Sequence, residues 1–223
     1  MLVVTSLSKW YGSHQVLHDI SLFFKRGDVH GVVGANGAGK TTLLKCICGL
    51  ESFSGKIGYD EGIIKNETGY LPADPYFLSN MSGYEYLQLL CNARDRKIKD
   101  LNSFNLFDLP LSKYAETYST GMQKQLAITG MLLQKNEIFI FDEPFNGVDI
   151  STSLLIKEIL LRLKQSNKLV IMSSQILSSL EESCDFLHYL KEGRIIKSVP
   201  KGQDIGIEMR NDDEALSILD SLI

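Results

Sequence analysis

The sequence has no long hydrophobic run, although 44% of its 223 residues are hydrophobic. A helix that crosses a bilayer needs roughly 18 to 20 largely apolar residues, and no stretch of this chain approaches that length. The first ten residues, MLVVTSLSKW, also lack a basic region followed by a long apolar run, which a secretion signal would have. We therefore expect a soluble, cytoplasmic protein with enough apolar content for one sizeable core.

The sequence also lacks an excess of positive charge and a cysteine spacing typical of disulfides or zinc sites. The formal net charge is -4, and no dense Lys/Arg stripe is present, which argues against nucleic acid as the main ligand. The four cysteines, at positions 46, 48, 91 and 184, fit neither a disulfide framework nor a zinc site, so we expect free, mostly buried thiols in a reducing compartment. The four histidines, at positions 14, 18, 30 and 188, are scattered without metal-ligand spacing, which favours structural roles.

The feature that the chain does contain is a glycine-rich segment, residues 34–42 (GANGAGKTT), which fits the pattern GxxxxGK[ST]. It lies between a predicted buried strand, residues 29–33, and a predicted helix, residues 41–48. Glycine permits the close backbone approach that lets successive N–H groups converge on phosphate oxygens at a helix N-terminus. We predict that the loop binds a nucleoside triphosphate through Gly34, Asn36, Gly37, Ala38, Gly39, Lys40, Thr41 and Thr42, with Lys40 at the β- and γ-phosphates and Thr41 on Mg²⁺.

A second segment, residues 137–143 (EIFIFDE), has four apolar residues that end in two carboxylates. The pattern indicates a central parallel strand buried on both faces, with its acidic residues at the carboxyl end where α/β sheets bind ligands. It looks like a Walker B strand. We predict that Asp142 holds Mg²⁺ through water and that Glu143 orients and deprotonates the water that attacks the γ-phosphate.

The segment between these two motifs, residues 118–126 (YSTGMQKQL), resembles the signature of ABC ATPases, LSGGQ followed by a helix. Its Gly-Met form resembles the subgroup whose partners are export-type permeases. Ser119 is predicted to cap the helix, and the free N–H groups at its start offer a phosphate site. The resemblance implies that Ser119, Gly121, Met122 and Gln123 contact ATP held by the opposite subunit.

The resemblance to ABC ATPases extends from about residue 2 to residue 199 and assigns further residues. Tyr11 matches the aromatic residue that stacks on adenine, and Asp149, in residues 144–149 (PFNGVD), matches the loop that reaches across the dimer interface. Two positions depart from the family pattern. Ala73 stands where the family has Gln or Glu, so that Asp74 or a water must substitute unless the contact is absent. Gln175 stands where the family has the His that contacts the γ-phosphate, and its neutral amide cannot shuttle a proton.

The expected fold is a P-loop NTPase of the ABC type: one α/β domain over residues 1–223 with a mostly parallel central sheet and an antiparallel β edge. The sequence enters through a mixed β-sheet before the phosphate loop. A helical subdomain is expected at about residues 82–133, and a tail at about residues 200–223 has a possible short strand and an amphipathic helix at residues 213–222. Further strands are expected at residues 56–59, 68–71, 138–141, 169–173, 186–190 and 195–198, and helices at residues 84–93, 122–133, 152–164 and 177–183.

We therefore expect an ATP-binding and ATP-hydrolysing subunit of an ABC transporter, in which two ATP molecules are clamped between two subunits. Its partners would be a separately encoded membrane permease and a second ATPase subunit, identical or different, and the complex would lie on the inner face of the cell membrane. One alternative is a soluble ABC ATPase with an assembly or mechanical role, for example in iron-sulfur biogenesis. Another is an ATP-sensing subunit with slow turnover, which Ala73 and Gln175 suggest and Glu143 opposes.

Overall fold

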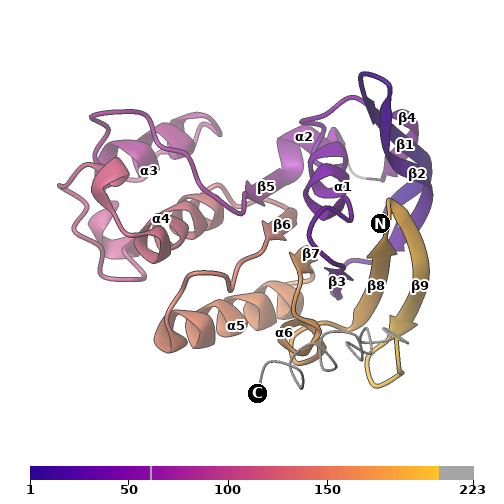
Figure 1. Cartoon of the computed structure of the whole chain (residues 1–223). Helices are drawn as coiled ribbons and strands as arrows, with labels where there is room; N and C mark the ends of the chain where they lie inside the picture. The colour runs from indigo at the N-terminus through magenta and orange to yellow at the C-terminus, as the bar shows by residue number, and fades with distance from the viewer. Residues whose placement is uncertain (61, 206–223) are drawn as a thin grey trace, which may run out of the picture.

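The computed structural model describes residues 1–60 and 62–205, which form two β-sheets with helices around them (Figure 1). The strands are β1 Leu2–Tyr11, β2 His14–Phe24, β3 Val29–Val33, β4 Ser54–Tyr59, β5 Thr68–Leu71, β6 Ile138–Asp142, β7 Leu169–Ser174, β8 Phe186–Lys191 and β9 Arg194–Pro200. The helices are α1 Lys40–Ile47, α2 Ile64–Glu67, α3 Gly83–Asn92, α4 Thr120–Leu133, α5 Ile150–Gln165 and α6 Leu177–Glu181, with 3₁₀ turns η1 Asn102–Phe104 and η2 Ala115–Thr117. None of these helices is long and apolar enough to cross a membrane.

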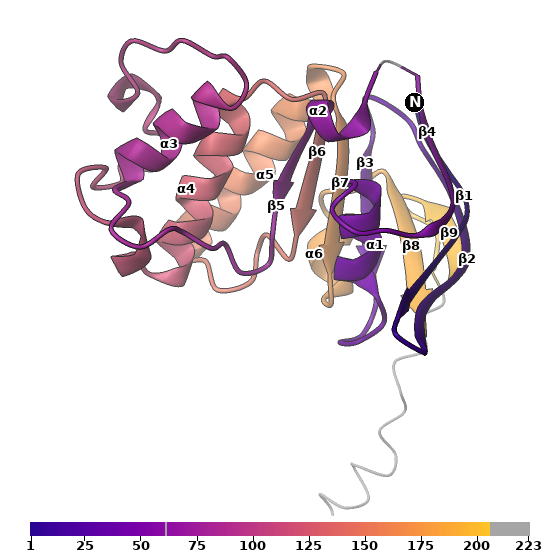
Figure 2. The ribbon, with the colours of Figure 1, turned by 90° about the horizontal axis from the view of Figure 1, so that it is seen from above.

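The larger sheet has the strand order β5-β6-β7-β3-β8-β9. All its neighbouring pairs are parallel except β8 and β9, which form an antiparallel hairpin at the edge. Strands β3, β6 and β7 are buried along their whole length. Because successive side chains of a strand point to opposite faces, β6 sends Phe139 and Phe141 into one core, with α4 and α5, and Ile138 and Ile140 into another, with α1. The central sheet is therefore covered by helices on both faces (Figure 2).

The smaller sheet has the order β2-β1-β4 and is antiparallel. It packs on α1 through apolar side chains such as Leu2, Leu17 and Phe24. The predicted mostly parallel sheet and antiparallel edge are confirmed. The expectation of a single mixed sheet at the N-terminus is wrong, because β1 and β2 join β4 in a sheet of their own and β3 joins the parallel sheet.

Helices α3 and α4 pack against each other, and α4 also contacts β5, in the region where the helical subdomain is predicted (Figure 1). Ser82 and Glu85 form a capping box at the start of α3. Helix α4 begins at Thr120, two residues before the predicted start, because Ser119 is the residue that caps it. The tail elements predicted beyond residue 205, including the helix at residues 213–222, lie outside the described residues.

Candidate nucleotide-binding site

The glycine-rich loop connects the carboxyl end of β3 to the first residue of α1. Gly39, which precedes α1, has φ of 106°, in the left-handed region that favours glycine. At Gly34 a Cβ atom would lie 2.3 Å from the carbonyl oxygen of Leu190, closer than real Cβ contacts. These two glycines are therefore required by the path of the loop, as the motif predicts for a phosphate cradle.

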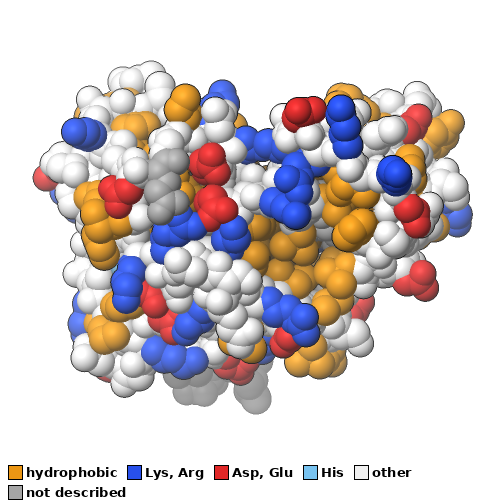
Figure 3. All heavy atoms as spheres, turned by 180° about the vertical axis from the view of Figure 1, so that it is seen from behind, with side chains coloured by type: hydrophobic (Ala, Val, Ile, Leu, Met, Phe, Trp, Pro, Cys, Tyr) orange, Lys and Arg blue, Asp and Glu red, His pale blue; other side chains and the backbone are white. Residues whose placement is uncertain are grey.

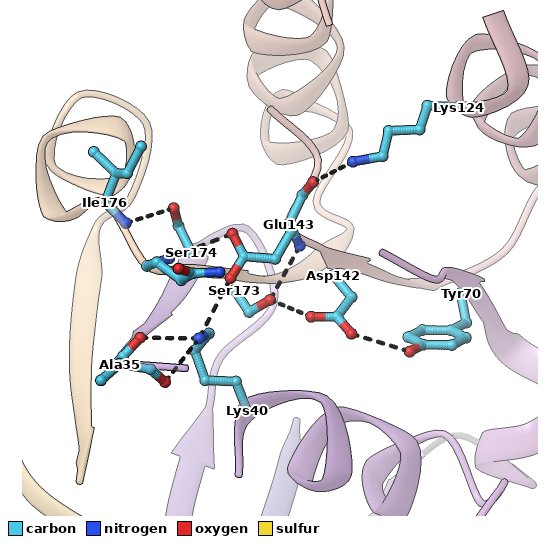
Figure 4. A network of polar contacts seen from close by, with 11 residues as sticks. Ala35, Lys40, Tyr70, Lys124, Asp142, Glu143, Ser173, Ser174 and Ile176 are labelled. Carbon is cyan, nitrogen blue, oxygen red and sulfur yellow. Dashed lines mark hydrogen bonds and ion pairs between the residues drawn. The ribbon is translucent and has the colours of Figure 1, made fainter. Parts of the chain in front are cut away.

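Lys40 is buried at the start of α1, with 6% of its surface exposed. Its Nζ donates to the carbonyl oxygens of Gly34 at 2.9 Å and Ala35 at 3.2 Å, and lies 3.3 Å from Oε1 of Glu143 (Figure 4). The ammonium group is thus held inside the turn of the loop and faces a carboxylate. An incoming phosphate, which is also anionic, would compete with Glu143 for this cation.

Asp142 is fully buried at the end of β6 and accepts two hydrogen bonds from neighbouring strands. Ser173 Oγ on β7 donates to Oδ1 at 2.5 Å, and the Tyr70 hydroxyl on β5 donates to Oδ2 at 3.3 Å (Figure 4). Burial, followed by the charge of Asp142, raises the pKa of Tyr70 far above its ordinary value, so the hydroxyl keeps its proton. Each carboxylate oxygen retains further acceptor capacity, and such oxygens are the ligands that Mg²⁺ prefers.

Glu143 follows with φ of 50°, in the left-handed region. Its backbone N–H donates to Ser173 Oγ at 3.1 Å, and its Oε2 accepts from the backbone N–H of Gln175 at 3.3 Å. The side chain is therefore turned toward Lys40 rather than into the sheet (Figure 4). A carboxylate that faces the phosphate-binding lysine is placed where a general base is needed.

A cavity of about 440 Å³ opens between the loop and the ends of β6 and β7. It brings together the predicted site residues Lys40, Thr41, Glu143 and Gln175. Ala73, the other position that departs from the family pattern, also lines it, next to Asp74. Its lining is Val16, Asn36, Gly37, Gly39, Lys40, Thr41, Thr42, Ala73, Asp74, Glu143, Asn146 and Gln175. Most of the predicted loop residues and Glu143 are thus assembled around one space, while Asp142 is buried next to Glu143 and does not line it.

Tyr11 is not part of this lining. It is 45% exposed at the end of β1, and the Lys9 ammonium lies 4.6 Å from the centre of its ring. Lys9 in turn pairs with Glu51 at 2.9 Å. The exposed ring leaves a face for a base, and its role toward adenine stays a prediction.

The signature segment also lies outside the cavity. Ser119 caps α4 by accepting from the backbone N–H of Met122 at 3.3 Å, as predicted. Asp149 caps α5 by accepting from the backbone N–H of Thr152 at 2.7 Å, and this bond holds the pKa of the carboxyl below its usual range. Within one chain Asp149 is therefore occupied at a helix start, and its predicted contact across a dimer remains a prediction.

The sequence model of the family described as ABC transporter matches residues 17–146. The chain belongs to the ABC transporter family. The bacitracin transport ATP-binding protein BcrA of Bacillus licheniformis is 32% identical over 218 residues, covering 90% of the chain and 70% of BcrA. The lantibiotic transport ATP-binding protein SrtF of Streptococcus pyogenes is 28% identical, covering 88% of the chain and 89% of SrtF. The resemblance to ABC ATPases is confirmed, and the chain is an ATP-binding subunit of that family.

Solved structures of ATP-binding cassettes have the same fold as this chain. The structure of an ATP-binding subunit of an ABC transporter matches with a TM-score of 0.80 at 25% identity, covering 98% of this chain and 99% of that one. A dimeric ATP-binding cassette bound to ADP and Pi has the same fold, with a TM-score of 0.79 at 18% identity, covering 92% of this chain and 100% of that one.

An uncharacterized ABC transporter ATP-binding protein of Nostoc is 32% identical to this chain and is longer than it. The match covers 82% of this chain and 59% of the relative.

Three polar residues of this ABC ATPase site were not predicted from the sequence. Tyr70 and Ser173 bond Asp142 from the strands on either side of β6, and Ser173 stands directly opposite Asp142 in the sheet register. A polar residue at the end of a predicted buried strand was the available signal for Ser173. Asn146 lines the cavity from the turn after β6, within a segment that was interpreted only as a dimer loop.

Proposed function

We propose that the chain binds Mg-ATP at this cavity and hydrolyses it, and that hydrolysis powers an exporter. The observation that carries the proposal is that Lys40 and Glu143 line one cavity and face each other at 3.3 Å, with Asp142 buried directly before Glu143 at the end of β6. Transport cannot be performed by a nucleotide-binding unit alone, so a separately encoded permease is part of the proposal.

The residues present fit a magnesium ion. Thr41 and Asp142 would hold it, because one offers a hydroxyl oxygen beside Lys40 and the other a buried carboxylate with bound hydroxyl donors. When bound, Mg²⁺ supplies positive charge that neutralises the phosphates. Lys40 would exchange its ion pair with Glu143 for contacts with phosphate oxygens, and the freed carboxylate of Glu143 would accept a proton from the attacking water.

Gln175 and Ala73 support slow turnover. Gln175 lies in the cavity and can donate its amide to the γ-phosphate, but it cannot carry the positive charge that a protonated histidine would. Ala73 has no polar group, and its neighbour Asp74 is the acidic residue that lines the cavity beside it. We expect normal ATP affinity and weak hydrolysis in the isolated chain.

The proposed working unit is a dimer. The start of α4, with residues 119 and 120 exposed, presents backbone N–H groups on a surface that does not line the chain's own cavity. A phosphate held by a second subunit would complete that site. Whether the second subunit is a copy of this chain or a related one is decided by the dimerisation experiment below.

The permease would dock on the helical region. Figure 3 shows hydrophobic side chains gathered in a hollow on the face opposite to that of Figure 1. A cavity of about 520 Å³ is lined by residues from the η1 segment and the end of α4, and Phe104 and Leu106 there are 51% and 45% exposed. BcrA is named for bacitracin transport and SrtF for lantibiotic transport, and these names support the proposed transport role. The permease would hold the chain on the inner face of the cell membrane.

The first test is ATP binding by Lys40→Ala, measured by isothermal titration with the wild type as reference. Loss of the ammonium removes charge-assisted hydrogen bonds worth roughly 1.5 to 3 kcal/mol, so affinity should fall at least tenfold. Lys157→Met, a half-buried position on α5 that does not line the cavity, is the control and should bind ATP as the wild type does. Equal ATP affinity of Lys40→Ala and the wild type would contradict the proposed site.

The partner is tested by co-purification of the tagged chain from membranes. Recovery with a polytopic membrane protein is the expected result. Recovery from the soluble fraction alone, together with assembly factors, would instead favour the assembly ATPase that the sequence left open.

A further inference from the structure

Lys124, on the first turns of α4, is a buried cation that the ATP-site assignment does not use. Only 1% of its surface is exposed. Its Nζ donates to the backbone carbonyl oxygen of Glu143 at 2.7 Å (Figure 4). It also donates to the backbone carbonyl oxygen of Asn146 at 2.6 Å. Both distances are short, as charge-assisted hydrogen bonds are.

Burial of this ammonium group is costly, because a cation that leaves water must recover its solvation from the protein. No carboxylate of the described residues lies within ion-pair distance of Lys124 Nζ. Hydrogen bonds to the two carbonyl oxygens therefore replace the solvation that the ammonium group loses. Burial still lowers the pKa of Lys124. The hydrogen bonds of this buried lysine therefore stabilise the backbone conformation of the segment that contains the two carbonyls.

The backbone that Lys124 holds is the turn that projects Glu143 into the cavity. Glu143 has φ of 50°, a conformation that side-chain-bearing residues adopt rarely, and the N–H of Asn146 donates back to its carbonyl at 3.3 Å. A left-handed residue of this kind persists only when its surroundings fix it. The contacts of Lys124 lie at both ends of this four-residue turn.

The same helix holds the rest of the segment. Gln125 Nε2 donates to Thr152 Oγ1 at 2.6 Å, at the helix start that Asp149 caps. At Gly121 an added Cβ would lie 3.3 Å from the carbonyl oxygen of Gly147, so the first turn of α4 packs directly on the same loop. The signature helix thus contacts the segment from residue 143 to residue 152 at three places.

We propose that Lys124 is a positioning residue for ATP hydrolysis: it fixes the backbone of Glu143, and so the direction of its carboxylate, from the signature helix of the same chain. The inference rests on the proposed function of Glu143 as the base. Lys124 bonds the backbone carbonyls of Glu143 and Asn146 but does not itself line the cavity, so it acts on the chemical step rather than on nucleotide affinity.

Single-turnover hydrolysis and ATP titration of Lys124→Met test the inference. Misplacing a reacting group by about 1 Å can cost ~10²-fold in rate, so turnover should fall about 10- to 100-fold, while the Kd for Mg-ATP stays within about threefold of the wild type. Lys124→Gln, whose amide keeps two donors, should recover turnover to within about threefold of the wild type. Lys124→Ala, which admits water to the two carbonyls, should lose turnover as Lys124→Met does. It replaces Lys124→Met in the test if that variant does not fold.

The deciding comparison is the double variant with Glu143→Gln. If Lys124 acts through Glu143, the Lys124 substitution should change turnover less than twofold once the carboxylate is gone, because effects of residues that act as a unit do not add. A full additional loss in that background, or a parallel loss of ATP affinity, would overturn the inference and leave the proposed function intact. A wild type that neither binds nor hydrolyses ATP would overturn both.

Discussion

At the scale of single residues, the proposed mechanism couples nucleotide binding to the release of a base. Oε1 of Glu143 lies 3.3 Å from Lys40 Nζ, and Oε2 accepts from the backbone of Gln175. A phosphate that takes over Lys40 removes one of these two contacts. The carboxylate is therefore held by the lysine until the phosphate of ATP is present to replace it.

Gln175→His should raise turnover. A positioned donor at developing charge is commonly worth ~10²- to 10³-fold, and a histidine adds the possibility of positive charge to the donor that Gln175 already has. We expect an increase of about tenfold in the ATPase rate, with ATP affinity within about twofold, measured by phosphate release. Gln175→Ala is the matched control and should slow the reaction. A brisk wild type that Gln175→His slows down would show that Gln175 is a working substitute.

At the scale of elements, two buried histidines join β3 to the β8–β9 hairpin. The backbone N–H of Lys25 donates to His30 Nε2 at 3.2 Å, so His30 Nδ1 carries the proton that bonds His188 Nε2 at 3.2 Å. His188 Nδ1 then donates to Ser198 Oγ at 2.8 Å. Both rings are neutral in this chain of bonds, which bears out the structural role predicted for these two histidines.

Protonation of this pair should destabilise the fold in acid. Burial lowers the pKa of His30 to about 4 and that of His188 to about 3, so below their ordinary value of 6.5 the unfolded chain binds more protons than the folded one. The free energy of unfolding should be constant above pH 6.5 and fall toward pH 4, by roughly 3 kcal/mol for each of the two rings.

Urea unfolding at several pH values measures this loss. The reference is the double variant His30→Gln/His188→Gln, which keeps hydrogen-bonding groups but has no ring to protonate. Its stability should decline less between pH 6.5 and pH 4 than that of the wild type. Parallel declines would show that the pair contributes nothing to the pH dependence.

The elements that the sequence predicted well are those whose pattern is local. Strands β3, β6 and β7 are buried on both faces, and that condition leaves continuous apolar runs. The N-terminal hairpin was not resolved from the sequence because its register shifts three times between residues 4 and 10, which interrupts the alternation of apolar and polar residues. Helix α2 spans four residues and is too short to show a helical period.

The residues of the site also divide into those that belong to local sequence motifs and those that only the fold brings together. Lys40, Asp142 and Glu143 belong to short contiguous motifs, so the sequence identified them. Tyr70 and Lys124 reach the site from β5 and α4, and only the folded arrangement places them beside Asp142 and Glu143. The prediction of free, buried cysteines is confirmed at all four positions.

At the scale of the whole molecule, each chain supplies two different surfaces for phosphate. The cavity at the ends of the parallel strands contains the loop and the base, while the start of α4 lies outside it. In the proposed dimer, a complete pair of sites would need two chains, and α4 of each chain would contact the nucleotide of the other. The account predicts that ATP itself holds the two chains together.

The most direct test is the mass of Glu143→Gln in solution, measured by light scattering on a sizing column. The glutamine keeps the shape of the side chain but cannot act as a base, a role typically worth ~10²- to 10⁴-fold, so bound ATP should persist. With Mg-ATP the account predicts a particle of twice the 25.0 kDa of one chain, and with no nucleotide, or with Lys40→Ala added, a single chain. A single chain at saturating Mg-ATP would contradict the ATP-clamped dimer of this subunit.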